Sequence, residues 1–246
     1  MRIALMGDIH SNREAFSACL AHASECGADR YVFLGDYVGY GADPNWVVNR
    51  IAELTTEGAI AVAGNHDRAI GIERSRMNAA AGMAIEWTAS QLDRTAAEFL
   101  STLPLTIEDE DRLYVHADAS RPGDWIYVDE TASAAASLGA TRQRVTFCGH
   151  VHVPMLFGIT ATQKILSFAP LAGSPVPLLR QRRWLAVVGS VGQPRDRNSA
   201  AAYAIYDTST CEFKSLRVPY DVETAAGKIR AAGLPESLAA RLSLGR

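Results

Sequence analysis

The first third of the chain repeats one pattern three times: a short apolar run that ends in glycine, followed by a segment with helical spacing. The runs are IALMG (3–7), YVFLG (31–35) and AIAVAG (59–64). Strands that alternate with helices predict a parallel sheet covered by helices, and the carboxyl ends of its strands lie along one edge. We therefore expect a ligand site among the residues that follow these three runs.

The segments after the three runs carry helix signals. Ser11-Asn12-Arg13-Glu14 matches a capping box before AFSACLAHASEC, and Asp43-Pro44 precedes WVVNRIAEL. An Ala-rich stretch from about residue 78 to residue 100 is expected to be one long helical segment, which serves as packing or as a lid. Together these signals predict three strand–helix units.

After Leu105 the sequence changes to short apolar runs separated by turns, a pattern typical of strands. These runs are RLYVHA, RVTFCGH, PMLFGI, KILSFA, WLAVVGS, AYAIYD and FKSLRV, and two helical stretches at about 222–232 and 236–243 close the chain. We predict an α/β (α+β) fold in which two mixed β-sheets form a sandwich flanked by helices. The length fits a single domain that spans residues 1–246.

The charge balance restricts the class of partner. With 24 basic and 27 acidic residues the net charge is only -3, so no global field draws the protein onto nucleic acid or an anionic membrane. Polar residues interrupt every apolar run well before the roughly 18 positions of a membrane span, and Met1 leads into a strand-like run. We expect a soluble cytoplasmic protein with no nucleic-acid partner and no membrane partner; no sequence feature specifies an oligomeric state.

Side chains of the types that bind metal ions in proteins, namely Asp, Asn and His, follow five separate strand-like runs. They are Asp8 and His10, then Asp36, then Asn65, His66 and Asp67, then His116, and finally His150 and His152. Asp8 and His10 are two positions apart, so in an extended chain they point to the same side, which suits chelation of one cation. A single histidine at a strand end is usually a hydrogen-bonded bystander. Because five strands each end in such residues, we expect these side chains to lie close together in one site.

The donor set predicts two metal ions. Two carboxylates, one amide and four imidazoles are enough ligands for two divalent ions when one carboxylate bridges them. Oxygen and imidazole donors without thiolate favour Mn, Fe, Zn, Co or Ni over Ca. Two ions about 3.5–4 Å apart activate a bridging water and stabilise the attacking and leaving oxygens of phosphoryl transfer. The expected cofactors are two divalent ions, with Mn first and Fe, Zn, Ni, Co or Mg as alternatives.

Five ordered blocks carry a resemblance to a known family. They are Asp8-x-His10, Gly35-Asp36, Gly64-Asn65-His66-Asp67, His116 and Gly149-His150-x-His152. In this order they resemble the calcineurin-like metallophosphoesterase superfamily, and GDYVGYGADPN (35–45) is similar to its small bacterial and archaeal phosphoesterases. The resemblance implies a four-layer architecture, with helices outside two packed sheets.

The family pattern also implies a role for each residue. One metal ion would be held by Asp8, His10 and His152, the other by Asn65, His116 and His150, and Asp36 would bridge both. His66 would face the phosphate, where it stabilises charge or protonates the leaving oxygen, and Asp67 would orient His66.

The implied activity is that of a binuclear metal-dependent phosphohydrolase, in the first place a phosphodiesterase in which a metal-bridging hydroxide attacks phosphorus in line. A phosphomonoesterase or a hydrolase of nucleotides such as dinucleoside polyphosphates is the alternative. A non-catalytic scaffold of the same fold is disfavoured, because all ligand positions and His66 are present.

Phosphoprotein phosphatases of the superfamily carry Asp-Arg after the second block and Glu after the third histidine. In this chain GDYVGYG lacks that arginine, and the third block ends in Asp67. The sequence therefore disfavours a phosphoprotein phosphatase.

Four further residues are candidates for contact with a small phosphorylated substrate such as a nucleotide: Asn12, Tyr37, Ser190 and Arg195. Asn12 either caps a helix or bonds a phosphate oxygen, and Tyr37, like Tyr40, either packs or stacks on a base or an aromatic leaving group. In VGSVGQPRD (188–196), Ser190 would line the edge of the site and Arg195 would meet a phosphate, unless this segment is a surface turn.

Overall fold

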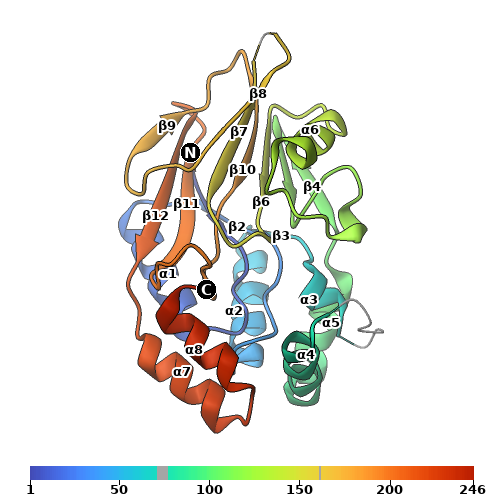
Figure 1. Ribbon diagram of the computed structural model, residues 1–246, viewed down its shortest axis with the longest axis vertical. Helices are drawn as coiled ribbons and strands as arrows, with labels where there is room; N and C mark the ends of the chain where they lie inside the picture. The colour runs from blue at the N-terminus through green and yellow to red at the C-terminus, as the bar shows by residue number, and fades with distance from the viewer. Residues whose placement is uncertain (71–76, 161) are drawn as a thin grey trace.

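Two six-stranded sheets pack face to face at the centre of the protein, in a computed structural model that describes residues 1–70, 77–160 and 162–246 (Figure 1). Sheet A has the strand order β3-β2-β1-β11-β12-β9, and sheet B has the order β4-β5-β6-β10-β7-β8. The strands are β1 (Arg2–Met6), β2 (Arg30–Phe33), β3 (Ile60–Ala61), β4 (Thr106–Asp109), β5 (Arg112–Val115), β6 (Val145–Cys148), β7 (Met155–Ile159), β8 (Ile165–Phe168), β9 (Pro175–Pro177), β10 (Arg183–Val187), β11 (Ala201–Asp207) and β12 (Glu212–Val218).

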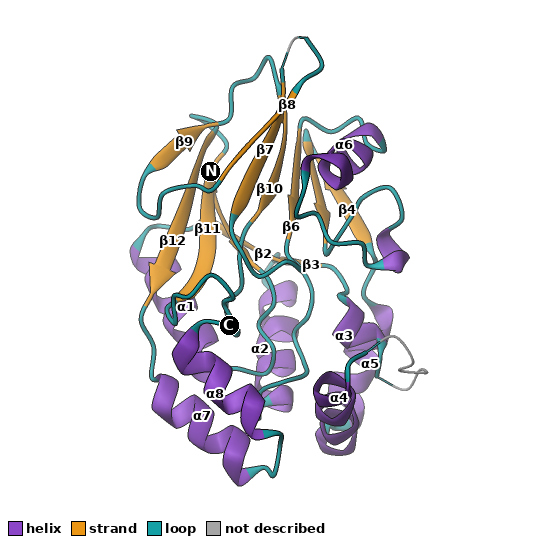
Figure 2. Cartoon of the chain, viewed as in Figure 1, coloured by secondary structure: helices purple, strands orange, loops and turns teal. Residues whose placement is uncertain are grey.

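The helices lie outside the two sheets and below their lower edge (Figure 2). They are α1 (Arg13–Glu25), α2 (Pro44–Thr56), α3 (Asn65–Arg68), α4 (Ala79–Gln91), α5 (Arg94–Thr102), the 3₁₀ turn η1 (Pro122–Asp124), α6 (Thr131–Gly139), α7 (Val222–Ala231) and α8 (Glu236–Leu244).

Both sheets mix parallel and antiparallel pairs. β1, β2 and β3 are parallel to one another, as are β5, β6 and β10. The other neighbours pair antiparallel. The predicted sandwich of two mixed sheets is confirmed. The carboxyl ends of β1 and β6 meet across the two sheets, since the backbone N–H of His150 donates to the Asp8 carboxylate at 3.0–3.1 Å.

Apolar side chains fill three interfaces and so define four layers. Ile3 and Val32 of sheet A meet Tyr114, Phe147 and Trp184 of sheet B between the sheets. The other face of sheet A is covered by α1 and α2, and the other face of sheet B by α6. This helix–sheet–sheet–helix order is the four-layer architecture that the sequence resemblance implies.

The helical hairpin of α7 and α8 lies beside the region into which the strand ends point (Figure 1). Its apolar face, which includes Ile229, packs with α4 and with the ring of Tyr40. The Lys228 ammonium ties α7 to the rest of the protein, at 2.6 Å from Glu14 Oε1 and 2.8 Å from Asp43 Oδ2. The hairpin is therefore held against the first turn of α1 and the residue that precedes α2.

Two helix predictions need correction. The Ala-rich stretch forms two helices, because Leu92 leaves the helical conformation and Asp93 caps a new helix. The first helix begins at residue 13, because the side chain of Asn12, rather than that of Ser11, accepts the capping N–H. Glu14 does not complete a capping box; its carboxylate instead accepts from Lys228 in α7.

The strand predicted at residues 59–63 is shortened to β3, because this edge strand pairs with β2 at two positions only. The sequence pattern also missed β4, β9 and α6. The segment that forms α6, TASAAASLG, contains a single large apolar side chain, Leu138, so its apolar periodicity is weak. Its place in the fold comes from packing of Ala134 and Leu138 on sheet B.

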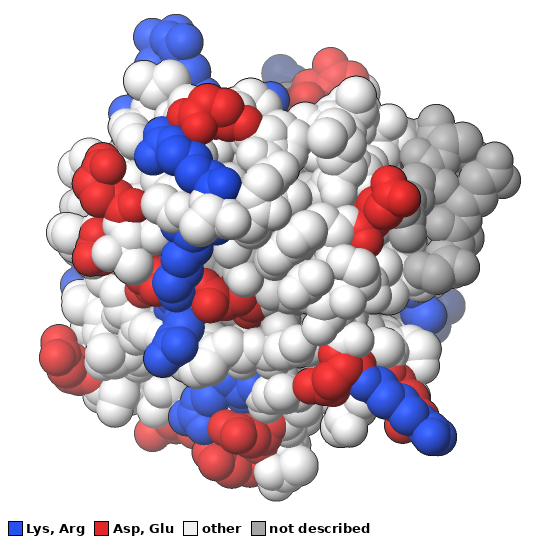
Figure 3. All heavy atoms as spheres, turned by 90° about the horizontal axis from the view of Figure 1, so that it is seen from below, with Lys and Arg blue, Asp and Glu red and all other residues white. Residues whose placement is uncertain are grey.

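No helix within the described parts of the chain is long and apolar enough to span a bilayer. On the face seen from below, basic and acidic side chains are interspersed among uncharged ones (Figure 3). This face therefore carries charges of both signs.

Candidate metal centre

The polar residues singled out in the sequence converge at the carboxyl ends of strands from both sheets. Sheet A supplies Asp8 and His10 after β1, Asp36 after β2, and Asn65 and His66 at the start of α3, while sheet B supplies His116 after β5 and His150 and His152 after β6. Three overlapping groups of these side chains have ligand atoms within 4.8 Å of one another: Asp8, His10 and His152; His10, Asp36 and His66; and Asp36, His116 and His150. Every residue in these groups is buried.

The backbone is held in an uncommon conformation at most of these positions. Asp8, His10, Asp36, His150 and His152 all have positive φ angles, between 49° and 66°. Residues other than glycine rarely adopt this left-handed conformation, which costs on the order of 1–2 kcal/mol each. Such strain persists only where the surrounding structure enforces it, and it tends to collect at functional sites.

One half of the cluster is built from Asp8, His10 and His152. The Nε2 atoms of the two imidazoles are 3.2 Å apart, and Oδ1 of Asp8 is 3.4 Å from Nε2 of His152. Oδ2 of Asp36 lies 3.7 Å from Nε2 of His10. Two nitrogens about 2.1 Å from one tetrahedral or octahedral ion are about 3.0–3.4 Å apart, so this spacing suits ligands of a single ion.

The other half is built from Asn65, His116 and His150. Nε2 of His116 lies 3.1 Å from Nδ1 of His150 and 3.2 Å from Oδ1 of Asn65. The same Nε2 atom is 3.4 Å from Oδ2 of Asp36. Oδ2 of Asp36 is thus close to imidazoles of both halves, which is the position that a bridging carboxylate requires.

The second ring nitrogen of each imidazole in the two halves faces a backbone carbonyl oxygen. The pairs are His10 Nδ1 with Val38 at 3.0 Å, His116 Nδ1 with Leu34 at 2.7 Å, His150 Nε2 with Trp125 at 2.9 Å, and His152 Nδ1 with Gln193 at 2.6 Å. A carbonyl only accepts, so each of these nitrogens donates and each inner nitrogen of a neutral ring carries a lone pair. In the pair of His10 and His152, two inner nitrogens 3.2 Å apart then turn lone pairs toward each other. A cation between them removes this repulsion, so the donor set fits divalent metal ions.

Burial favours the neutral, metal-binding form of three of these imidazoles. It lowers the pKa of His150 to about 3 and holds the pKa values of His10 and His152 well below the usual histidine value. Neutral imidazole is the form that binds a metal ion. These three side chains are therefore able to act as ligands at neutral pH without first losing a proton.

The pKa values of the two carboxylates, Asp8 and Asp36, shift in opposite directions. Burial raises the pKa of Asp8 to about 7. Burial also opposes ionisation of Asp36, but the imidazoles of His116 and His66 outweigh it and hold the pKa of Asp36 well below its usual value. Burial likewise lowers the pKa of His116, yet Asp36 reverses the effect and raises it to about 9. The Asp36–His116 contact therefore concentrates opposite charges where the two halves meet.

His66 is placed differently from the four imidazoles described above. Its Nε2 points into the cluster, 4.0 Å from Oδ2 of Asp36, and its backbone N–H donates to Oδ1 of Asp36 at 2.8 Å. Its Nδ1 is buried without a hydrogen-bond partner among the described residues, and a Cβ on Gly39 would come within 2.3 Å of it. Among the described residues no carbonyl accepts a hydrogen bond from Nδ1 of His66. The proton of the neutral ring is therefore not held on Nδ1, and Nε2, which faces the cluster, is able to carry it.

Asp67 does not orient His66, contrary to the prediction. Its carboxylate accepts backbone N–H groups of Gly64 and Asp36 at 2.8 Å and of Tyr37 at 2.9 Å. These bonds join the turn after β3 to the loop after β2. Asp67 thus positions the backbone that carries Asp36 and acts on the cluster through that loop.

The side chains of three predicted substrate contacts are buried, and their polar atoms bond within the protein. The Tyr37 ring is fully buried, and its hydroxyl donates to the carbonyl of Val62 at 2.6 Å, so it cannot stack on a base. The Asn12 amide caps α1 and donates to the carbonyl of Gly192 at 2.9 Å. The Ser190 hydroxyl is fully buried and donates to the backbone carbonyl of residue 8 at 2.9 Å.

Arg195, the fourth candidate, lies beside the cluster. Its backbone N–H donates to the carbonyl of His152, and its Nη2 donates to Oε1 of Gln193 at 3.0 Å. Its Cζ is 5.9 Å from the centre of the Tyr40 ring, and that ring is 4.5 Å from His10 and 4.6 Å from His66. The segment from β10 to β11 is therefore part of the wall of the site.

Sequence reasoning missed the loop between η1 and α6, which contacts the half of the cluster built from His116 and His150. Trp125, with φ of 57°, offers its carbonyl to His150 and places its ring 5.9 Å from His116. Tyr127 stacks on His150 with ring centres 4.1 Å apart, although 49% of Tyr127 remains exposed. RPGDWIY (121–127) contains two aromatic residues after a Pro-Gly turn, which was the available signal.

Comparisons with known proteins agree with this geometry. The sequence model of the calcineurin-like phosphoesterase superfamily domain matches residues 1–211. An uncharacterised protein of Methanocaldococcus jannaschii is 35% identical over 251 residues, which cover 99% of this chain and 98% of that protein. The crystal structure of a metallophosphoesterase from Sphaerobacter thermophilus is 34% identical, with a TM-score of 0.90 over 100% of this chain and 99% of that one. A hypothetical protein from Pyrococcus horikoshii OT3 shares the fold at 21% identity, with a TM-score of 0.82 over 100% and 98% of the two chains. The chain belongs to the calcineurin-like phosphoesterase superfamily.

Proposed function

We propose that the protein is a phosphohydrolase with two divalent metal ions, and that its reaction is the hydrolysis of a phosphodiester. The observation that carries this proposal is the pair of opposed imidazole contacts, His10 with His152 and His116 with His150, on either side of Asp36. Because the outer nitrogen of each ring donates to a carbonyl, the inner nitrogen of each ring in its neutral form is the atom that would bind a metal ion. Two ligand halves around one carboxylate match a two-ion centre.

The residues divide the work in the following way. One ion would be held by Asp8, His10 and His152, and the other by Asn65, His116 and His150. Asp36 would bind both ions. Divalent ions bound there, with Mn the first choice, supply Lewis-acid activation of water and neutralise charge on a phosphoryl group. In the transition state, negative charge develops on the oxygens bound to phosphorus, and groups already fixed in position stabilise it best. The strained, buried backbone keeps the ligand side chains in place.

His66 is proposed as the group that contacts the substrate. Its bare Nδ1 is consistent with the tautomer that carries the proton on Nε2, the nitrogen that faces the cluster. From there its Nε2–H would donate a hydrogen bond to a phosphoryl oxygen, and the imidazolium form would pass its Nε2 proton to the leaving oxygen and become neutral. General acid catalysis of this kind typically contributes about 10²–10⁴-fold to a rate.

The test is the initial rate on bis(p-nitrophenyl) phosphate with added Mn, measured together with bound metal, for the wild type, Asp36→Asn and His66→Ala. We expect Asp36→Asn to lose both metal and activity. We expect His66→Ala to keep its metal and to lose about 10²–10⁴-fold in rate. Arg197→Gln, a change at an exposed side chain, is the control and should behave like the wild type. Equal loss of metal in both site variants would contradict the assigned roles.

The same assay decides the class of ester. A rate that requires metal on the diester, with little on p-nitrophenyl phosphate, supports a phosphodiesterase. A rate on the monoester alone moves the assignment to a phosphomonoesterase or a nucleotide hydrolase. Metal binding without turnover of any phosphate ester leaves the non-catalytic scaffold.

A further inference from the structure

Arg195 is a cation whose charge has no partner in the described structure. Its Nε is buried and makes no hydrogen bond, and across residues 1–70, 77–160 and 162–246 no carboxylate oxygen lies within 4.0 Å of its guanidinium. Its neighbour Asp196 is engaged by Arg217 instead. A guanidinium has five N–H donors, of which Gln193 uses one. A partly buried cation with unused donors is costly unless an anion binds beside it.

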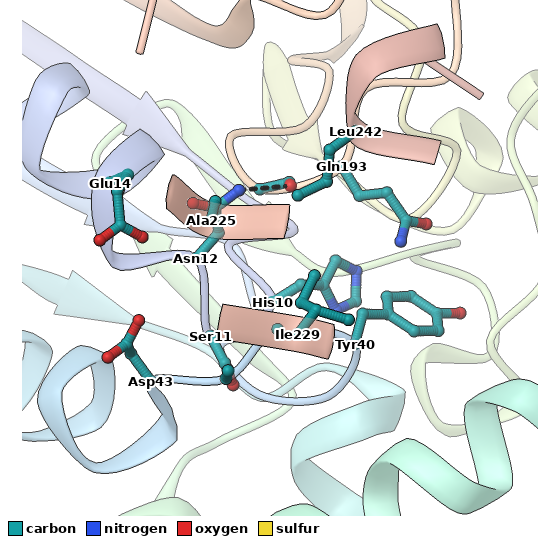
Figure 4. A pocket seen from close by; sticks show the side chains of 13 residues that line it. His10, Ser11, Asn12, Glu14, Tyr40, Asp43, Gln193, Ala225, Ile229 and Leu242 are labelled. Atoms are coloured by element: carbon teal, nitrogen blue, oxygen red, sulfur yellow. Dashed lines mark hydrogen bonds between the residues drawn. The ribbon is translucent and has the colours of Figure 1, made fainter. Parts of the chain in front are cut away.

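The side chains around Arg195 fix its position. Gln193, which is 1% exposed, turns its amide oxygen to the guanidinium, and the Tyr40 ring lies within cation–π range on another side. The Nε2 of Gln193 is buried without a hydrogen-bond partner among the described residues and is directed toward the rings of His10 and Tyr40 (Figure 4). Two buried N–H groups, one on each residue, therefore lack an acceptor in the same corner of the site.

The charges at the site indicate which kind of hydrogen-bond acceptor would bind beside Arg195 and Gln193. Two divalent ions bring four positive charges to the cluster, and Asp8 and Asp36 supply two negative charges in return. Arg195 adds a further positive charge at the edge of the centre, next to His10, His152 and Tyr40. With Arg195 included, the site has three positive charges in excess, and a phosphodiester with a single phosphate brings only one negative charge. A second phosphate would bring further negative charge beside the guanidinium.

We propose that Arg195, with Gln193 and Tyr40, forms a subsite for a second phosphate group adjacent to the one that reacts. The preferred substrate would then be a disubstituted phosphate in which one substituent on the reacting phosphorus is a second phosphate, as at the α-phosphorus of a nucleoside polyphosphate or in another substituted pyrophosphate. Arg195 is half-buried at the rim, whereas the proposed metal ligands His10 and His152 are at most 2% exposed. This position suits a group that extends from the reacting phosphorus toward solvent. The assignment rests on the proposed function for the identity of the reacting centre.

The test compares binding of inorganic pyrophosphate with binding of inorganic phosphate to the Mn-loaded protein by isothermal titration calorimetry. Free Mn is held constant in both titrations, so that complexes in solution are accounted for. The variants are Arg195→Gln, Arg195→Lys and the control Arg197→Gln, which removes a positive charge from an exposed side chain two residues away. Circular dichroism and thermal unfolding establish that each variant is folded.

We expect the wild type and Arg197→Gln to bind pyrophosphate at least 10-fold more tightly than phosphate. Arg195→Gln should weaken pyrophosphate about 10- to 100-fold more than it weakens phosphate, because one charged hydrogen-bond partner is lost. Arg195→Lys should recover part of this difference through its charge, without the planar fork.

Equal weakening of both anions in Arg195→Gln would place the guanidinium on the reacting phosphate and overturn the proposal. Unchanged binding of both anions would overturn it as well. This result is separate from the outcome for the proposed function, because the titrations need no turnover. A protein that fails to hydrolyse diesters but retains the Arg195-dependent preference for pyrophosphate would still have the subsite.

Discussion

At the scale of single residues, the centre depends on side chains whose conformations are fixed before any ion arrives. Carbonyl oxygens select one tautomer in four imidazoles, and five of the expected ligands sit on a left-handed backbone. The residue types and their order were readable from the sequence. The tautomers and the backbone strain were not, because both depend on atoms that lie far away along the chain.

The backbone strain leads to a prediction at His152, whose φ is 64°. His152→Gly and His152→Ala both remove the imidazole, but glycine adopts this φ without a steric penalty. With metal removed by chelator, His152→Gly should be more stable than His152→Ala by about 1 kcal/mol, or roughly 2–4 °C in Tm. Thermal unfolding by circular dichroism measures this difference. An alanine variant that matches or exceeds the glycine variant would show that the position is unstrained.

The burial of Tyr37 leads to a second prediction. Tyr37→Phe removes a fully buried hydroxyl that donates to the carbonyls of Val62 and Phe33. We expect a loss of about 1 kcal/mol of stability with an unchanged KM for bis(p-nitrophenyl) phosphate, because the ring does not reach substrate. Chemical denaturation and steady-state kinetics supply the two readings. A rise in KM at unchanged stability would return Tyr37 to the substrate site.

At the scale of elements, close approach of loops brings the ligand-bearing strand ends together. A Cβ on Gly64 would lie 2.2 Å from Oδ1 and 2.3 Å from the backbone N of Asp36. Gly64 therefore has to be glycine for the turn before α3 to pack on the loop after β2. Asp67 then joins these two segments through three short backbone hydrogen bonds.

Gly64→Ala should separate the two loops, weaken metal binding at least 10-fold and lower stability by roughly 1–3 kcal/mol, as overpacking usually does. Gly82→Ala is the matched control, since Gly82 is in α4 and a Cβ there meets nothing within 4 Å. That change should raise stability by about 0.5–1 kcal/mol through helix propensity. Metal titration and thermal unfolding measure both effects. Normal metal affinity in Gly64→Ala would mean that the loops adjust.

The elements differ in how well the sequence predicted them. The three strand–helix units and the strand-rich second half were predictable, because alternating patterns report burial on one face. The boundary at Asp93, the shortness of β3 and the existence of α6 were not, since each is decided by pairing or packing with distant segments. The role of Asp67 was missed for the same reason: its neighbours along the chain do not include the loop it binds.

At the scale of the whole molecule, the centre joins the two sheets. Asp8, His10, Asp36 and Asn65 follow strands of sheet A, and His116, His150 and His152 follow strands of sheet B. An ion held by both sets ties the halves of the sandwich together at one edge. Metal binding should therefore appear in the stability of the entire fold.

Adding Mn at about 100 times its dissociation constant should raise the free energy of unfolding by about 2.7 kcal/mol and the Tm by about 5–10 °C. A chelator should reverse the shift. The Asp36→Asn variant should show little response to Mn, because it lacks the residue shared by both halves. Differential scanning calorimetry follows each case. A Tm that is independent of metal in the wild type would contradict a centre that couples the sheets.

The division of the ligands between two sheets also has a consequence for how this lineage is able to change. Ile3 and Trp184 pack between the sheets and are not among the expected ligands, yet their volumes contribute to the spacing at which the two sets of side chains face each other. Natural selection for the metal centre therefore acts on the interior as well as on the ligands. A substitution between the sheets persists in descendants only when a neighbouring residue changes to restore the spacing. Residues that pack between the sheets should therefore change in correlated pairs among related sequences.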